Sequence, residues 1–342
     1  MYNGENTEAN GHASHAEGGA TKASSEVAHA EGLNTVAGRI SQIIDPATGN
    51  IRELTNEEIS ILASEALRIG LITSQSEFNT AVAMKLIGFA SHAEGSETKA
   101  LGTSSHAEGN NTEAASNSSH AEGDSTRAWG ETSHAEGYLT EANGNQSHSE
   151  GKQTKAQGNS SHAEGIETQA LKEASHAEGS KTIASGNSAH AEGIETQANG
   201  WASHTEGGHN VTDGAFSHIE GRGNYIGNND NYSTEIVDTN TKAYCAHAEG
   251  QGTKATGNSS HAEGTKTIAN GKNSHAEGRK TTASGNASHA EGSETTASGD
   301  YSHAGGLGTK TTNVAEFACG KYNISDNNQL FSVGAGQSDS AR

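Results

Sequence analysis

The chain has 342 residues, with 21 Lys plus Arg against 42 Asp plus Glu, which gives a formal net charge of −21. Only 40 residues are Leu, Ile, Val or Phe, too few for the cores of the two ordinary domains that this length suggests. So acidic a chain is a poor partner for nucleic acid or an anionic membrane. We also expect no transmembrane helix, membrane insertion or signal peptide, because no stretch approaches about 18 apolar residues and the start lacks a basic-then-apolar segment.

A five-residue motif, Ser-His-Ala-Glu-Gly or a close variant, recurs seventeen times. Its histidines follow at 14-residue steps from His92 to His218 and again from His247 to His303. Low apolar content with high net charge is typical of disorder, but a disordered chain would not keep this register. Self-similarity at a short fixed period instead predicts a solenoid.

Each unit reads S-H-A-E-G-x-x-T-x-A-x-G-x-x, as in residues 260–273, and splits into two similar halves of seven. Each half fits a short strand followed by a two-residue turn after Gly, which tolerates left-handed backbone. Fourteen residues are too few for a helix-containing repeat. We therefore predict an all-β solenoid whose coils stack into two parallel sheets, a flattened β-roll.

The variable positions predict which side chains face outward. Lys99, Arg127, Gln169 and Thr296 occupy the position between Thr and Ala in the second half, so Thr and Ala should face the interior. Because side chains alternate along a strand, Ser and Ala of the first half should also face inward. His and Glu should then face outward on the other sheet.

The near-constant His and Glu imply the same environment at every coil. Association of three copies around a common axis would supply it, and it would give the glutamates the partners that buried carboxylates need. We expect His–Glu pairing within and between chains, with the His pKa raised by Glu. The predicted trimer interface comprises His92, Glu94, His106, Glu108, His120, Glu122, His134, Glu136, His162, Glu164, His176, Glu178, His190, Glu192, His261, Glu263, His275, Glu277, His289, Glu291, Phe317, Phe331 and Val333.

The last three residues of that set come from the C-terminal coils. Continuing the 14-residue steps places Phe317 and Cys319, then Phe331 and Val333, in the His and Glu positions. Apolar replacement is expected if these positions are buried by association. Gly305 occupies the preceding Glu position and would make room for the change.

The 14-residue repeat resembles the heads of trimeric autotransporter adhesins, whose units carry Ser-Val-Ala-Ile-Gly. It resembles more closely the repeat regions of phage tail fibres and tail appendages, where the His-Glu version is common. Residues 318–323 and 330–342 look like the stretch that precedes a self-cleaving chaperone in such phage proteins. The resemblance implies a left-handed parallel β-roll trimer. Because no anchor or chaperone is present, we expect a fragment or a processed product.

Two interruptions divide the predicted β-roll, which occupies residues 1–37, 91–221 and 245–342. Residues 38–90 read as a helical-hairpin insertion, with a capped amphipathic helix over 55–70 and a second helix from 74 or 76 to 88. We expect it to stabilise the fold, or else to serve as a docking site. Residues 222–244 read as a loop, and its Tyr225, Tyr232 and Tyr244 are receptor-binding candidates.

Chemistry at the motif is expected to be structural. Adjacent Ser and His point to opposite faces of a strand, so no catalytic triad forms, and we predict no enzyme and no catalytic residue. Rings of histidines such as His134, His148, His162 and His176 could ligate zinc or nickel. His–Glu hydrogen bonding would satisfy both groups without metal, so we expect no metal and no cofactor. Cys245 and Cys319 lie five coils apart, too far for a disulfide.

The sequence thus predicts a non-enzymatic trimeric fibre segment of a phage or phage-like tail, which spaces or presents a receptor-binding element. Its expected partners are two further copies, other tail or baseplate proteins, and a host surface glycan or protein. We expect it in the virion tail after assembly in the bacterial cytoplasm. The alternative is a trimeric adhesin head on the bacterial surface, and a polysaccharide-cleaving tailspike is a weaker one.

Overall fold

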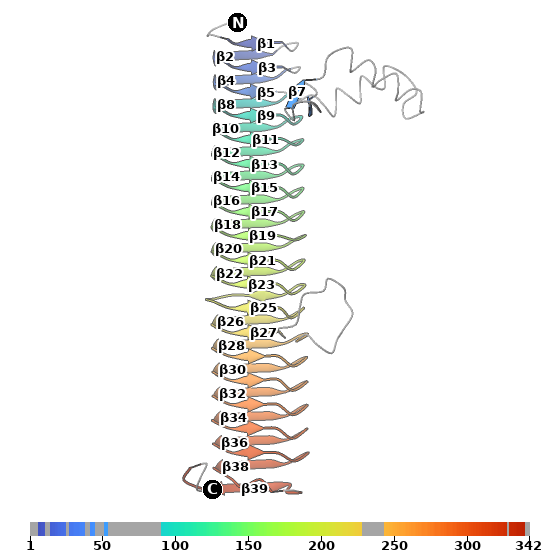
Figure 1. The fold of residues 1–342 in the computed structure, drawn as a ribbon, viewed down its shortest axis with the longest axis vertical. Coiled ribbons are helices and arrows are strands. Elements are labelled where there is room, and N and C mark those ends of the chain that lie inside the picture. The colour runs from blue at the N-terminus through green and yellow to red at the C-terminus, as the bar shows by residue number, and fades with distance from the viewer. Residues whose placement is uncertain are drawn as a thin grey trace, which may run out of the picture. The chain divides into compact units, whose positions relative to one another are not determined.

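The computed structural model describes residues 6–10, 14–24, 27–37, 42–44, 51–53, 90–227, 243–326 and 328–338. The chain divides into two compact units, Met1–Ile166 and Glu167–Arg342. Each unit is a parallel β-solenoid (Figure 1). The described residues form about 18 coils and contain no helix. The predicted all-β solenoid is therefore confirmed.

Each coil of the first unit contributes one strand to each of two parallel ladders. The long-strand ladder consists of β2 (His15–Gly19), β4 (His29–Leu33), β8 (His92–Ser96), β10 (His106–Asn110), β12 (His120–Asp124), β14 (His134–Tyr138), β16 (His148–Lys152) and β18 (His162–Ile166). The short-strand ladder consists of β1 (Glu8–Ala9), β3 (Lys22–Ala23), β5 (Val36–Ala37), β9 (Lys99–Ala100), β11 (Glu113–Ala114), β13 (Arg127–Ala128), β15 (Glu141–Ala142) and β17 (Lys155–Ala156).

The second unit has the same two ladders. Its long-strand ladder consists of β20 (His176–Ser180), β22 (His190–Ile194), β24 (His204–Thr205), β26 (His218–Arg222), β28 (His247–Gln251), β30 (His261–Thr265), β32 (His275–Arg279), β34 (His289–Ser293), β36 (His303–Leu307), β38 (Phe317–Lys321) and β39 (Phe331–Ala335). Its short-strand ladder consists of β19 (Gln169–Ala170), β21 (Ile183–Ala184), β23 (Gln197–Ala198), β25 (Val211–Thr212), β27 (Tyr225–Ile226), β29 (Lys254–Ala255), β31 (Ile268–Ala269), β33 (Thr282–Ala283), β35 (Thr296–Ala297) and β37 (Lys310–Thr311).

The ladders keep equivalent residues of successive coils side by side. In β10 and β12, for example, His106 pairs with His120 and Glu108 with Glu122. The coil that follows each insertion joins the same ladder, since His29 of β4 pairs with His92 of β8 and His218 of β26 with His247 of β28. The insertions therefore do not change the register of the ladder.

Small residues fill the interior, as the alternation predicts. Ala121 and Ala128 are fully buried from the two sides of one coil, and Thr126 and Ser119 lie beside them with almost no exposed surface. The Ser hydroxyls of the motif donate to the backbone, as Ser133 does to the Gly130 carbonyl at 2.6 Å. Such a core contributes little hydrophobic energy per coil, so the backbone ladders carry much of the cohesion.

The motif glycine is required by close approach as well as by conformation. Gly264 has φ of +102°, and a Cβ there would lie 2.2 Å from the carbonyl oxygen of Gly278 in the next coil. The repeat predicts that glycine supplies the left-handed backbone of the turns. In many turns that role falls on a non-glycine residue, such as Glu97 at φ 58° and Ser104 at φ 56°.

Two coils of the second unit depart from the small-residue interior. Ile219 and Ile226 are fully buried where other coils have Ala. Asn210 and Asn224 replace Thr, and the Asn224 amide donates to the backbone carbonyls of Glu220 at 2.6 Å and Gly250 at 3.0 Å. These coils lie next to the second insertion.

The first insertion is described only in part. Two strands, β6 (Gln42–Ile44) and β7 (Ile51–Glu53), pair antiparallel. Both predicted helices, over 55–70 and 74–88, lie outside the described residues, as does most of the loop after β27 (residues 228–242) with Tyr232.

Candidate functional site

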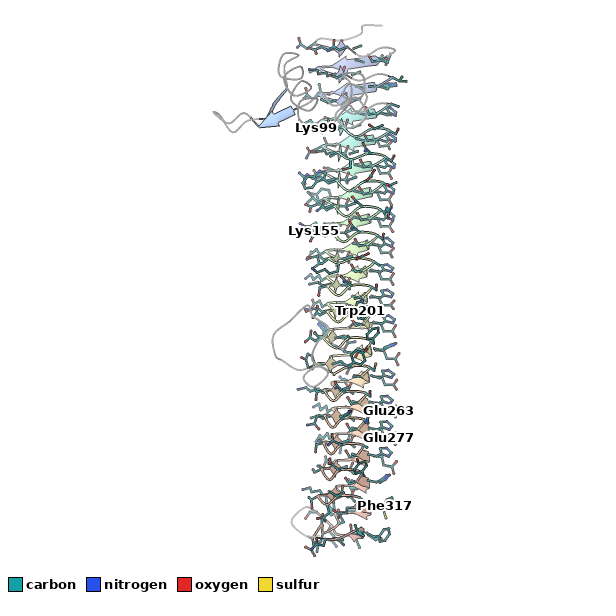
Figure 2. All side chains as sticks on the ribbon, turned by 90° about the vertical axis from the view of Figure 1, so that its right-hand side faces the viewer. Lys99, Lys155, Trp201, Glu263, Glu277 and Phe317 are labelled. Atoms are coloured by element: carbon teal, nitrogen blue, oxygen red, sulfur yellow. The ribbon has the colours of Figure 1, made fainter. Side chains whose placement is uncertain are left out.

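The outward face of each long-strand ladder carries the motif His and Glu side chains. In β12, His120 and Glu122 are two residues apart and therefore share a face, while Ala121 between them is buried. Figure 2 shows Glu263, Glu277 and Phe317 along one edge of the second unit. The predicted outward orientation of His and Glu is confirmed, and Ser and His of a motif face opposite sides. We call this outward face of a long-strand ladder the seam.

Within each unit the imidazole rings of the seam stack along the ladder. Ring centroids of His106, His120 and His134 are 4.7 and 4.6 Å apart, with planes 5° and 3° from parallel. The rings tilt near the insertions, where His218 makes 47° with His247. The coil spacing of the ladder thus sets the ring spacing, which widens to 5.1 Å between His218 and His247 at the second insertion.

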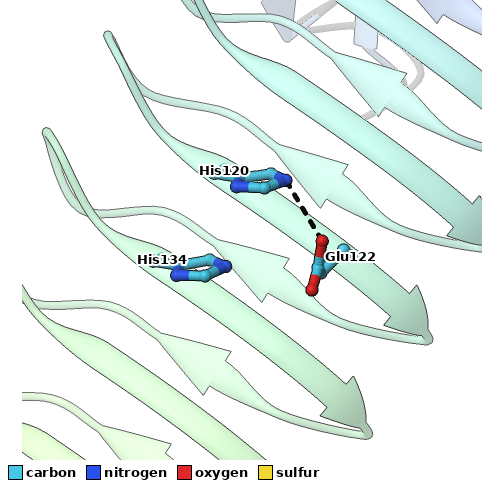
Figure 3. Close-up of side chains that lie close together, drawn as sticks. All are labelled: His120, Glu122 and His134. Carbon is cyan, nitrogen blue, oxygen red and sulfur yellow. Dashed lines mark ion pairs between the residues drawn. The ribbon is translucent and has the colours of Figure 1, made fainter.

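His and Glu of one coil are close but not hydrogen-bonded along most of the seam. The Nε2 of His120 lies 3.6 Å from the nearest carboxylate oxygen of Glu122 (Figure 3), and the same distance is 3.7 Å in the His261–Glu263 pair. Hydrogen bonds from N–H to O span about 2.7–3.2 Å. The direct His–Glu hydrogen bond expected from the sequence is therefore absent from these pairs within one chain.

The electrostatics of the stack oppose protonation. Burial lowers the pKa of His120, His134 and His261, and the neighbouring imidazole in the stack lowers it further. The adjacent glutamates raise it by a smaller amount. In the single chain the His pKa is thus lowered, because burial and the histidine of the next coil outweigh the glutamates. The pKa is lowered in the same way at His92, His190, His247, His275 and His289. The raised His pKa that the sequence predicts for the trimer stays a prediction.

The carboxylates form a second column beside the rings. Burial, together with hydrogen bonds to Glu263 and Glu291, raises the pKa of Glu277 to about 7. Its carboxylate also lies 3.7 Å from the Nε2 of His289 in the following coil. Glu150 and Glu291 likewise lie within 3.5 Å of the Nε2 of the histidine in the following coil.

The seam becomes apolar at the C-terminal end of the second unit. Phe317 stacks on His303 with 4.7 Å between ring centroids, and Phe331 follows Phe317 at 5.7 Å. Phe317, Phe331 and Val333 are 39%, 61% and 64% exposed. A Cβ at Gly305 would lie 2.8 Å from a carboxylate oxygen of Glu291, so the glycine makes room for the glutamate of the preceding coil. The chain on its own therefore leaves a row of large apolar side chains uncovered.

Sets of two histidines and one glutamate recur along the seam. One ring nitrogen from each of two stacked histidines and a carboxylate oxygen of the Glu between them in sequence lie within 4.8 Å of one another. Two of these sets are His120, Glu122, His134 and His148, Glu150, His162. Imidazole nitrogen and carboxylate oxygen are common zinc ligands. Of the metal-ligand candidates from the sequence, His134, His148 and His162 fall in such sets in the first unit, and His176 does so with Glu178 and His190 in the second.

The tyrosine candidates have different environments. Tyr225 is half-buried, and its hydroxyl donates to Asp213 at 3.0 Å. Tyr244 is 40% exposed and its ring lies 5.2 Å from that of Phe216, which contacts Trp201 at 4.7 Å. Sequence reasoning missed Trp201 and Phe216, although both are aromatic departures from the small or polar residues common in these turns.

Three further residues of the second unit are a buried glutamate and two cysteines. Glu316 replaces the motif Ser and is buried, and one of its carboxylate oxygens accepts hydrogen bonds from the backbone N–H groups of Thr312 and Asn313. Sequence reasoning gave it no role. Cys245 and Cys319 are both free thiols, in agreement with the predicted lack of a disulfide between them.

The chain matches no known family model and no curated protein sequence. No helix among the described residues is long and apolar enough to cross a membrane.

Proposed function

We propose that this chain is a non-enzymatic segment of a homotrimeric fibre in a phage or phage-like tail. In this proposal the 14-residue coils form a left-handed β-roll, and three copies meet through their seams. The fibre spaces or presents an element that binds a host surface glycan or protein, and it contacts other tail or baseplate proteins. It belongs to the virion and is assembled in the bacterial cytoplasm.

The observation that carries the proposal is the seam of the second unit. Its His and Glu side chains are repeated coil after coil, and the seam ends in Phe317, Phe331 and Val333. Exposing such a row of apolar side chains to water is unfavourable. The outward residues of the opposite, short-strand ladder vary, as is expected of positions that face solvent. A threefold contact would cover the apolar end and give every coil the same surroundings.

The alternative is a trimeric adhesin head on a bacterial surface, which would use the same seam. A polysaccharide-cleaving tailspike has less support, because its chemistry needs a specific pair of carboxylates whereas the glutamates here repeat identically. The genes flanking the full-length reading frame distinguish the first two: neighbouring tail genes favour the phage, and an export signal with an outer-membrane anchor favours the adhesin.

The oligomer is tested by light scattering coupled to size exclusion. We expect three times the chain mass of 35.0 kDa. Phe331→Asp should dissociate the trimer, because it buries an unpaired charge at the contact. The matched change Tyr301→Asp, at an exposed turn off the seam, should leave the trimer intact.

A second variant tests the seam within the regular coils. Combining His134→Val with His162→Val should preserve the trimer, because the C-terminal coils already carry apolar side chains at the equivalent positions. A folded monomer of the unaltered chain would overturn the proposal.

A further inference from the structure

The Nε2 atoms of several seam histidines have no hydrogen-bond partner among the described residues. The Nε2 atoms of His120, His134, His190 and His261 have almost no solvent-accessible surface and make no hydrogen bond. A buried polar atom without a partner costs free energy. The nearest candidate is the glutamate of the same coil, and it is too far away for a hydrogen bond.

The distance between these atoms matches the spacing of two ligands on one metal ion. Zinc binds imidazole nitrogen and carboxylate oxygen at about 2.0–2.2 Å, so two ligands of a tetrahedral site lie about 3.4 Å apart. Nε2 and the nearest carboxylate oxygen are separated by 3.6 Å in the pairs His120–Glu122 and His190–Glu192, and by 3.5 Å in His106–Glu108. Shifts of a few tenths of an ångström would bring both atoms onto one ion.

Two histidines of one stack fit the same ion less well. Their ring centroids are 4.6–4.7 Å apart in the His106, His120, His134 series, whereas two zinc–nitrogen bonds span at most about 4.2 Å. One chain therefore offers one imidazole and one carboxylate to each ion. The remaining ligands must come from other copies, so the inference rests on the proposed trimer.

We propose that the seam binds divalent transition-metal ions of the zinc class between the three copies. Each ion is held by Nε2 of a motif histidine and a carboxylate oxygen of the glutamate two residues later, and the same pair of one neighbouring copy completes a tetrahedral set of four ligands. Imidazole donors favour zinc, nickel or copper over magnesium or calcium. This reverses the expectation from the sequence, which assumed that His and Glu satisfy each other.

The charge of the seam favours the same ligand class. Sixteen motif glutamates accompany a formal net charge of −21, and the ladder places equivalent carboxylates side by side, as with Glu263 and Glu277. Cations along the seam offset this repulsion. The apolar coils at Phe317 and Phe331 offer neither ligand and should bind no ion.

The experiment measures zinc bound to the full-length protein after treatment with a chelator. Isothermal titration with zinc chloride gives the number of ions per trimer, and cobalt chloride reports the ligand geometry through its visible absorption. In a variant with Glu122→Gln, Glu136→Gln, Glu192→Gln and Glu263→Gln, zinc should no longer bind at these levels, and the number of ions per trimer should fall. Because these side chains face outward, circular dichroism should show an unchanged fold.

A matched control separates the seam from ordinary surface histidines. His209 lies outside the motif series and pairs with Glu195 at 3.0 Å, and both side chains are about half exposed. His209→Gln should leave the zinc count unchanged. An unaltered count in the four-glutamate variant, or no zinc binding by an intact trimer, would overturn the metal proposal. The mass without metal tests the trimer separately: a monomer with and without zinc overturns the proposed fibre, whatever the zinc count.

Discussion

The two ladders of each unit share one interior and differ in their outward faces. Both bury Ala at most coils, as at Ala262 and Ala269, and both are parallel ladders in the same register. Outward residues of the short strands vary, with Lys254, Ile268 and Thr282 in successive coils. Those of the long strands stay His and Glu. The fold therefore does not require His and Glu, and a contact outside the chain is the physical reason that best accounts for them.

The largest expected loss of stability comes from substituting glycines at which the backbones of successive coils approach closely. Gly264→Ala and Gly271→Ala should each cost about 3 kcal/mol or more, because a Cβ would lie 2.2 and 2.0 Å from a carbonyl oxygen of the next coil. Gly223 has φ of +67° with nothing within 4 Å of a Cβ, so Gly223→Ala should cost only about 1 kcal/mol. Urea unfolding measures all three. Equal losses at the three positions would contradict the coil spacing described here.

Enlarging an interior alanine should cause a smaller loss of stability, and the loss should be the same on the two ladders. Ala262→Val and Ala269→Val each add two methyl groups to a fully packed interior and should cost about 1–3 kcal/mol. Ile219 and Ile226 show that a coil accepts larger residues where its neighbours differ as well. If only one of the two substitutions destabilised the fold in urea unfolding, the interior would not be equivalent on its two sides.

The smallest effect is the pH dependence, which concerns only the seam. The folded state lowers the pKa of eight histidines, so the unfolded chain binds more protons near pH 6. Their contribution is present above pH 6.5 and is lost as pH falls through the lowered values. The free energy of unfolding, measured with chelator present, should therefore decrease from pH 7 to pH 5.

Glu277 acts in the opposite direction. Its pKa is raised to about 7, so its contribution is present below pH 4.5 and is lost as pH rises through 7. Eight histidines outweigh one carboxyl group, and Glu277→Gln should make the decrease toward pH 5 steeper. Greater stability at pH 5 than at pH 7 would instead support charged His–Glu pairs.

Much of the fold could be read from the repeat. The stacked parallel strands and the inward side of Ala, Ser and Thr follow from the repeat and from alternation along a strand, and the structure has them. The seam residues were found for the same reason, since a constant pair among variable neighbours is visible without coordinates. Trp201 and Phe216 were missed because aromatic side chains at turns carry no periodic signal.

The sequence by itself determined the solenoid and the face on which each motif residue lies, because a strict period leaves one way to alternate side chains. Only the tertiary structure decided the distances between the outward side chains and the direction of the histidine pKa shifts. The spacing of stacked coils sets histidine against histidine at 4.6–4.7 Å and histidine against glutamate at 3.5–3.7 Å along β10, β12 and β14. Burial and the neighbouring imidazole lower the pKa of His120 and His134, and the histidine–glutamate distance is too long for a hydrogen bond. Neither distance can be obtained from the order of residues.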